Sequence, residues 1–315
     1  MKKIKVVCFG GGTGLPTLLA GLKKNPWLEI SAIVTMFDTG GSSGELKDKF
    51  GILPPGDVLK CLLALSKDEK STREIFLKRI ANHSSPGHTG GNILLLGLEK
   101  VFGNITAAID ALGQMVSTSG KVLPVTLSHS TLCAEFEGDK IAGGETSIDM
   151  GVFEGMQVKK LYLSPSVRCN PAAIETIKSA DVICIGPGSF FTSVIPNFLP
   201  TGIKKAITES KASIIFIANI MTEGSGMRWN VEKVTGFLEI SMNQQIDRIL
   251  WNNYCHRDRI EEYAQQRKYP LLRGQIYKKD RYVPAELWTD PILARHDQDR
   301  LAYIVSNLIY ELTQK

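Results

Sequence analysis

The sequence lacks the patterns that would place it in a membrane, outside the cell or around a zinc ion. No apolar run reaches the roughly 18 residues that cross a bilayer. The first apolar run, VVCF, ends in glycine and is too short for the core of a signal peptide. The six cysteines are scattered and form no CxxC pair, so we expect reduced thiols rather than a metal site. We therefore predict a cytoplasmic protein.

Several motifs of catalysis and nucleic-acid binding are also missing. GxxxxGK[ST] is absent, which excludes a Walker-type phosphate loop, and no GxSxG elbow holds a nucleophilic serine. The net charge of +5 is modest, and no basic run is interleaved with aromatic residues. This balance does not indicate a nucleic-acid partner and is compatible with a small anionic ligand.

What the sequence does contain is an alternation of strand-like and helix-like segments, without internal repeats. Ile4–Phe9 and Ile30–Met36 read as strands, and ASIIFIANI is a near-continuous apolar run that suits the centre of a parallel sheet. We predict a doubly wound, mainly parallel, Rossmann-like α/β sheet in a single domain over residues 1–315. We place a small β-rich insertion at about 120–165 and a C-terminal helical segment at about 256–315.

We also predict the local structure of three stretches outside the main sheet. STREIFLKRIAN (71–82) has helical character, and HSSPGHTGG (83–91) reads as a loop. Asn92 follows that loop and could cap the next helix. TLCAEFEGDKIAGGET (131–146) reads as short strands joined by a hairpin turn.

Polar and glycine-rich residues follow four of the apolar strands. In a parallel sheet the carboxyl ends of the strands share one edge, where open α/β sheets bind ligands. We therefore expect one binding site at that edge. Its candidate binding residues are Gly10, Gly11, Gly12, Thr13, Gly14, Gly40, Gly41, Ser42, Ser43, Asn92, Gly186, Gly188, Ser189, Thr192 and Asn219.

Two of the loops, GGGTG (10–14) and GPGSFFTS (186–193), lead from a strand into a helix. Without a Cβ atom, backbone N–H groups can approach a phosphate, and the helix adds a partial positive charge. The alternative is that the glycines only form tight turns. If Gly12 faces a phosphate, Gly12→Val should abolish nucleotide binding and leave thermal stability nearly intact.

Three side chains are candidates for chemistry at this edge. Asp38 directly follows a strand and Asp57 ends the sequence PPGD. Mg²⁺ takes one or two carboxylates together with phosphate oxygens, and Asp38 and Asp57 could supply the carboxylates. Asp57 could instead be a helix N-cap. His88 could act as a general acid or base, or could be an ordinary solvated loop residue.

The longer stretches resemble one known family. GGGTGL, DTGGSSG, LPPGD, GHTGGNILL, GKVLPVTL, GGETSI, SADVICIGPGSFFTSVIPNFLPTGI and NIMTEG occur in the order found in the CofD/YvcK family, over about residues 4–300. The similarity is greater to the YvcK branch, the gluconeogenesis factors, than to the 2-phospho-L-lactate transferases.

The resemblance implies a Rossmann-like fold and a homodimer. YvcK-like members are cytoplasmic, bind UDP-sugars such as UDP-N-acetylglucosamine, and support cell shape and wall synthesis during gluconeogenic growth. CofD-type members transfer a phospholactyl group from a nucleotide-linked donor with Mg²⁺. The metal carboxylates of that pattern would fall on Asp38 and Asp57.

The sequence departs from the family pattern near the expected ligand edge. Thr39 follows Asp38, and Leu59-Lys60 replace an Arg-Asn pair. The GHxxGN loop carries Gly90-Gly91 where the family has a bulky residue before the last glycine, and MTEGSGMRW replaces an MTQPGET-like stretch at Gly224. These changes favour a nucleotide-binding protein over its alternative, an Mg²⁺-dependent phospholactyl transferase-like enzyme.

Overall fold

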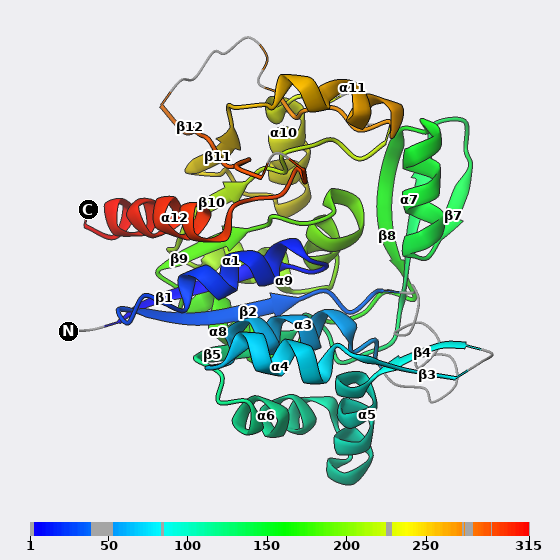
Figure 1. Ribbon diagram of the computed structural model, residues 1–315, viewed down its shortest axis with the longest axis vertical. Helices are drawn as coiled ribbons and strands as arrows, with labels where there is room; N and C mark the ends of the chain where they lie inside the picture. Colours follow the sequence, from blue (N-terminus) through cyan, green and yellow to red (C-terminus); the bar gives the residue numbers. More distant parts are fainter. Residues whose placement is uncertain are drawn as a thin grey trace.

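A parallel sheet of seven strands forms the centre of the protein (Figure 1). The computed structural model describes residues 3–38, 53–82, 85–224, 229–272, 274, 280–290 and 292–314. The strands stand in the order β12-β11-β10-β9-β1-β2-β5, which confirms the predicted α/β fold. Their bounds are β1 Ile4–Gly10, β2 Leu28–Val34, β5 Gly120–Pro124, β9 Val182–Ile185, β10 Ser213–Ile217, β11 Arg248–Asn252 and β12 Tyr282–Ala285.

Helices cover both faces of this sheet, which explains the apolar strands. Every residue of β9 is buried, as expected for a strand shielded on two sides. On one face lie α1 Gly14–Leu22, α3 Gly56–Leu65 and α12 Gln298–Thr313, and on the other α8 Pro171–Lys178, α9 Ile203–Glu209 and α10 Val231–Met242. Gly21 lets α1 and α12 approach closely, because a Cβ atom there would lie 2.4 Å from the Cβ of Ala302.

The strand order changes direction between β1 and β9. From β1 the chain builds toward β2 and β5, and later it builds from β9 toward β12 on the other side. The loops after β1 and β9 therefore start next to each other at the carboxyl edge, since Phe9 and Ile185 are partners in register. Such a switch point is where doubly wound sheets bind ligands.

A small antiparallel sheet forms the insertion. It consists of β6 Thr131–Phe136, β7 Ile141–Gly143 and β8 Val158–Ser164 in the order β7-β6-β8. The insertion starts later than predicted, because β5 belongs to the main sheet. A helix that we did not predict, α7 Glu145–Glu154, follows β7. It buries few apolar residues (Ile148 and Val152 among them), so its periodic signal is weak.

Two further predictions on local structure are corrected. The helix predicted over residues 71–82 ends early, as α4 Glu69–Phe76, and β3 Arg79–Asn82 follows it. Part of the predicted loop is β4 Ser85–Thr89, which pairs with β3. A backbone ladder between two short strands leaves little trace in hydrophobic periodicity, which explains both errors. The helices α5 Gly90–Phe102 and α6 Ile105–Met115 come next.

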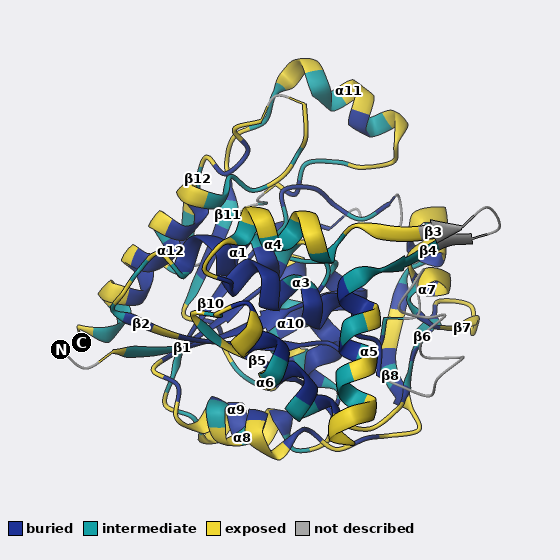
Figure 2. Ribbon diagram, turned by 60° about the horizontal axis from the view of Figure 1, so that its bottom comes forward, coloured by how far each residue is buried: buried dark blue, intermediate teal, exposed yellow. Residues whose placement is uncertain are grey.

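The C-terminal part is less helical than predicted. It contains α11 Arg257–Gln265, the edge strand β12 and α12. In Figure 2, α11 stands away from the body of the protein and is mostly exposed. Tyr263 is its buried residue. Among the described residues, no helix is both long and apolar enough to cross a bilayer.

Candidate functional site

The loops after β1 and β9 pack directly against each other. A Cβ atom on Gly14 would lie 2.4 Å from the carbonyl oxygen of Pro187, and one on Gly11 would lie 2.7 Å from a carboxylate oxygen of Asp57. Protein packing therefore already requires glycine at both positions. Gly12 has a φ of +61°, so a valine there would strain the backbone. The expectation that Gly12→Val leaves stability intact is therefore not supported by the geometry.

Asp57 joins the first loop to α3. Its buried carboxylate accepts a hydrogen bond from the N–H of Gly12 at 2.6 Å and another from the Lys60 ammonium at 2.9 Å. The N-cap of α3 is Pro55, so Asp57 is not a cap. Burial lowers the pKa of Lys60, but Asp57 and Asp38 together raise it above its ordinary value. Lys60 therefore stays charged beside both carboxylates.

Asp38 also contacts a third acidic residue, Glu145. Glu145, the first residue of α7, hydrogen-bonds with Asp38. Burial, followed by the charges of Asp38 and Asp57, raises the pKa of Glu145 to about 9. Sequence reasoning proposed Asp38 and Asp57 for one site, and the charges of both act on Glu145. It missed Glu145, whose only signal was the GGETSI stretch.

These residues do not form a ready metal centre. Both carboxylate oxygens of Asp57 already accept hydrogen bonds. In the part of the chain that the structure describes, no three His, Cys, Asp or Glu side chains are arranged to hold a metal ion. Mg²⁺ at Asp38 and Asp57 stays a prediction. Gly40, Gly41, Ser42, Ser43 and the Thr39 departure lie outside the described residues.

The loop after β9 is fixed by side chains from the end of β10. Asn219 accepts a hydrogen bond from Gly188 N–H at 3.2 Å and donates to the Gly188 carbonyl at 2.8 Å. Glu223 accepts from Phe190 N–H at 2.8 Å. The Gly188 N–H, which was predicted to face a phosphate, is thus used within the protein, as is the N–H of Phe190. Asn219 therefore positions the loop.

Two hydroxyl groups continue this network on the helical turn η1 Phe190–Val194 and just before it. Ser189 donates to Glu223 at 3.3 Å, Ser189 and Thr192 lie 2.6 Å apart, and Thr192 donates to Asp149 of α7 at 3.2 Å. Burial raises the pKa of Glu223 to about 7, assisted by Asp149 and opposed by the Phe190 hydrogen bond. Desolvation and then Asp38 raise the pKa of Asp149 to about 6, although much of that residue is exposed.

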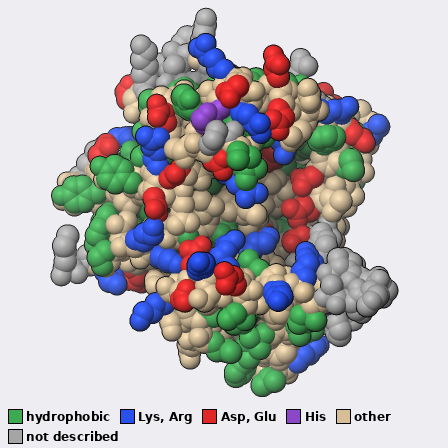
Figure 3. Space-filling view, viewed as in Figure 1, with side chains coloured by type: hydrophobic (Ala, Val, Ile, Leu, Met, Phe, Trp, Pro, Cys, Tyr) green, Lys and Arg blue, Asp and Glu red, His purple; other side chains and the backbone are tan. Residues whose placement is uncertain are grey.

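A cleft of about 810 Å³ opens at the carboxyl edge between these loops, α4, α11 and the segment 292–298. Figure 3 shows a hollow on this face, with Lys and Arg along its lower margin and Asp and Glu on one side. The charged side chains that line the cleft are Lys60, Arg73, Arg259, Lys268 and Arg295 and the acids Glu69, Glu223 and Glu262. The cationic side chains outnumber the acidic ones.

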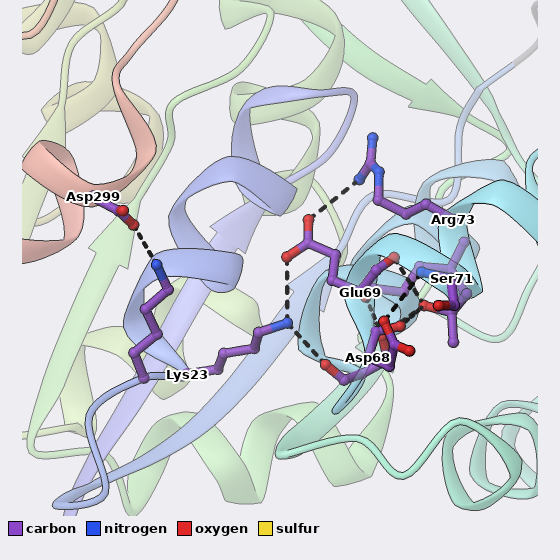
Figure 4. Close-up of polar contacts among 10 residues, drawn as sticks. Lys23, Asp68, Glu69, Ser71, Arg73 and Asp299 are labelled. Carbon is purple, nitrogen blue, oxygen red and sulfur yellow. Dashed lines mark hydrogen bonds and ion pairs between the residues drawn. The ribbon is translucent and has the colours of Figure 1, made fainter.

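The cleft wall formed by α4 is attached to α1. Glu69 accepts from Lys23 of α1 at 3.3 Å, and a nitrogen of Arg73 lies 3.9 Å from the other carboxylate oxygen of Glu69 (Figure 4). Asp68 caps α4 by accepting from Ser71 N–H. Lys23 thus holds the start of α4, and Arg73, in the last turn of the same helix, lines the cleft. No sequence motif indicated this arrangement.

Five predicted binding residues line the cleft: Thr13, Gly14, Gly188, Ser189 and Asn219. The other described candidates (Gly10, Gly11, Gly12, Gly186, Thr192 and Asn92) and the carboxylates Asp38 and Asp57 are not among its lining residues. His88 lies on β4, opposite Ile80, and does not line this cleft. Its catalytic role stays a prediction. Asn92 is buried in the first turn of α5, whose N-cap is Thr89.

Comparison with known proteins agrees with this architecture. The sequence model of the family described as 2-phospho-L-lactate transferase CofD matches residues 6–281. This chain belongs to the CofD family. A Thermotoga maritima relative is 40% identical over 97% of the chain and 99% of its own length. A Bacillus subtilis protein named gluconeogenesis factor is 33% identical over 98% of this chain and 99% of its own.

A similar protein of known structure has the same fold. The crystal structure of a UPF0052 family protein from Bacillus halodurans superimposes with a TM-score of 0.89 at 34% identity, covering 98% of this chain and 99% of that one. The two proteins therefore share this fold over nearly their whole length. The resemblance to the gluconeogenesis-factor branch is confirmed by the names and coverage of its relatives.

Proposed function

We propose that this CofD-family chain binds a nucleotide sugar, such as UDP-N-acetylglucosamine, in the carboxyl-edge cleft. The observation that carries the proposal is a cleft of about 810 Å³ at the switch point of the sheet, with five cationic side chains around it. This volume falls within the roughly 300–1,000 Å³ of small-molecule sites. The size suits a nucleotide sugar, and the charge suits its diphosphate.

The diphosphate would lie over Thr13 and Gly14, which line the cleft where α1 begins. The first-turn N–H groups of a helix have no intrahelical acceptor and favour anions. Lys60 lines the same side, and its bond to Asp57 holds the ammonium in place. Lys60 and Arg73, which both line the cleft, would neutralise the charge of the two phosphates.

The role that we propose is regulatory. We propose that the protein reports the level of a wall precursor and supports cell shape and wall synthesis during growth on gluconeogenic carbon, the role that the family resemblance implies. The name gluconeogenesis factor, which two relatives carry, supports the link to gluconeogenic growth. The homodimer predicted from the resemblance belongs to the same proposal.

Calorimetry tests this function. Titrations with UDP-N-acetylglucosamine, GDP and GTP, each with and without Mg²⁺, should give tight binding of the UDP-sugar that does not depend on the metal. Lys60→Met should weaken that binding roughly tenfold or more, because it removes one charged contact. Lys67→Met is the matched control, because Lys67 is exposed and does not line the cleft.

The alternative is a phospholactyl transferase-like enzyme. Asp38 and Asp57, whose charges both act on Glu145, favour it, as does the description of the family. Metal-dependent turnover of a nucleotide-linked phospholactate, or UDP-sugar binding that requires Mg²⁺, would support this alternative and overturn the binding-only function.

A further inference from the structure

A chain of four side chains leads from the cleft through the β9 loop to α7. Glu223 lines the cleft and Ser189 lies beside it. Three oxygen–oxygen contacts join the chain: Glu223 to Ser189 at 3.3 Å, Ser189 to Thr192 at 2.6 Å, and Thr192 to Asp149 at 3.2 Å. Thr192 is buried and Asp149 is largely exposed. The chain thus connects solvent beside α7 with the wall of the cleft.

Counting hydrogens shows that this chain needs one more proton than its hydroxyl groups carry. Each hydroxyl has a single hydrogen, and an ionised carboxylate has none. The two hydroxyls of Ser189 and Thr192 can therefore fill only two of the three contacts. With both carboxylates ionised, one contact would join two bare oxygen lone pairs. One carboxyl proton completes the chain.

The proton has a defined place on Glu223. Its Oε1 accepts from Phe190 N–H at 2.8 Å and from the Asn219 amide at 3.4 Å. Its Oε2 is the atom that faces Ser189. A proton on Oε2 would point at the hydroxyl of Ser189 and would not disturb either bond at Oε1.

We propose that Asp149 and Glu223 share one proton through Ser189 and Thr192. To move it, Glu223 Oε2 gives its proton to Ser189 Oγ, Ser189 gives its own to Thr192 Oγ1, and Thr192 gives its own to Asp149 Oδ1. No atom is gained or lost, and the negative charge passes from Asp149 to Glu223. All three hydrogen bonds are kept and reverse their direction.

The shared proton matters for the cleft if the proposed function holds. An anionic ligand beside Ser189 would draw the proton toward Glu223, leaving the negative charge on Asp149, away from the cleft. The pKa values of about 6 for Asp149 and about 7 for Glu223 are close enough for either end to hold it. Near the Asp149 end of the chain, the charged groups are Asp38 and Glu145, with Lys60 and Asp57 beyond them. Near the Glu223 end, the charged or titratable groups that line the cleft are Arg259, Glu262, Lys268, Arg295 and His296.

Two conservative variants distinguish a proton shared by Asp149 and Glu223 from a proton that stays on one of them. In Glu223→Gln, the amide oxygen accepts from Phe190 and the amide nitrogen donates to Ser189, so the chain is complete with Asp149 ionised. In Asp149→Asn, the amide nitrogen can donate to Thr192, and in that orientation the chain runs the other way with Glu223 ionised. Neither variant needs a carboxyl proton, and each is nearly isosteric with the residue it replaces.

Infrared spectroscopy of the protein without ligand, at a pH of about 6.5, measures the C=O stretch of protonated carboxyl groups. We expect each of the two variants to lose the intensity of the same single protonated carboxyl. Bands from other acids, including Glu145, cancel in the difference spectra. The surface variants Asp110→Asn and Glu137→Gln are exposed controls and should lose none. Loss in only one of the two test variants, or in neither, overturns the proposal.

A second measurement uses UDP as the probe. Wild-type affinity should fall by up to about tenfold per pH unit above the pKa of the shared proton. Glu223→Gln should abolish this dependence, and Asp149→Asn should bind weakly at every pH, because its charge stays at the cleft. If UDP affinity depends on pH in the same way in the three proteins, the proposal of a shared proton is overturned. A wild type that binds no UDP counts against the proposed function, and the infrared result then decides on the shared proton independently.

Discussion

The carboxylate of Asp57 accepts a hydrogen bond from the backbone N–H of Gly12, at 2.6 Å, while its other oxygen holds the ammonium of Lys60. One buried side chain thereby fixes the glycine loop after β1 to the helix α3. The N–H group of a glycine loop at a switch point would ordinarily be assigned to a ligand. Here an internal anion occupies it, and Lys60 turns toward the cleft.

Asp57→Asn should destabilise the protein by about 2 kcal/mol. The asparagine has one acceptor oxygen for two donors, so its amide must face either Gly12 N–H or the Lys60 ammonium. The change in the free energy of unfolding is measured by urea denaturation. Asp110→Asn, at an exposed position of α6, is the control and should shift it by less than about 0.5 kcal/mol. Equal stability of the two variants would contradict the role given to Asp57.

Gly14→Ala should also destabilise the protein, by about 1–3 kcal/mol. The new Cβ atom would meet the Pro187 carbonyl oxygen at 2.4 Å, and because this is a backbone atom the two loops must separate. Gly97, inside α5, has nothing within 4 Å of the place that a Cβ atom would take. Gly97→Ala should therefore stabilise the protein, by roughly 0.5–1 kcal/mol. Denaturation curves of the pair should shift in opposite directions, and a shared direction would refute the packing argument.

The sequence was sufficient to predict the sheet and its functional edge because those signals are local. Runs such as VICI and SIIFI are buried on both faces, and the residues after them must lie at the carboxyl edge. Asp38 follows such a strand, whereas Asp57 was assigned to the same site by the resemblance to the family. The short strands β3 and β4 were missed because a ladder of a few residues has no comparable periodicity.

The rest of the site depends on contacts between distant segments. Glu145 and Asp149 belong to α7, which reaches the carboxyl edge only because the insertion folds back on the main sheet. Arg259 enters the cleft from the C-terminal part of the chain. Glu223 lies within a departure from the family pattern, and its partners become visible only once the β9 loop is folded. No single-sequence pattern brings these residues together.

Asn219→Asp should loosen the β9 loop. The Asn219 amide donates to the Gly188 carbonyl at 2.8 Å and to Glu223 at 3.4 Å. A carboxylate in its place would oppose both acceptors with a negative charge. We expect a loss of about 1–3 kcal/mol in the free energy of unfolding, measured by chemical denaturation. Asn253→Asp, at an exposed position, should have little effect. An equally small effect at Asn219 would show that its hydrogen bonds to Gly188 and Glu223 do not contribute to stability.

His296 should make the protein sensitive to acid. Its Nε2 donates to the Ala218 carbonyl at 3.1 Å, and burial lowers its pKa to about 4, against the raising effect of that bond. Unfolded histidine takes up a proton near pH 6.5. Between these values the unfolded state binds more protons, so stability is present above about pH 6.5 and falls as pH drops toward 4.

The loss amounts to at most about 1.4 kcal/mol per pH unit. His296→Gln keeps a donor for Ala218 but has no proton to gain, so its stability should fall less steeply over this range. Urea denaturation at a series of pH values measures the two slopes, and all other titrating groups contribute equally to both proteins. His129→Gln, at an exposed position, should follow the wild type. If the wild type and His296→Gln show parallel profiles, the half-buried imidazole of His296 is not the source of the acid sensitivity.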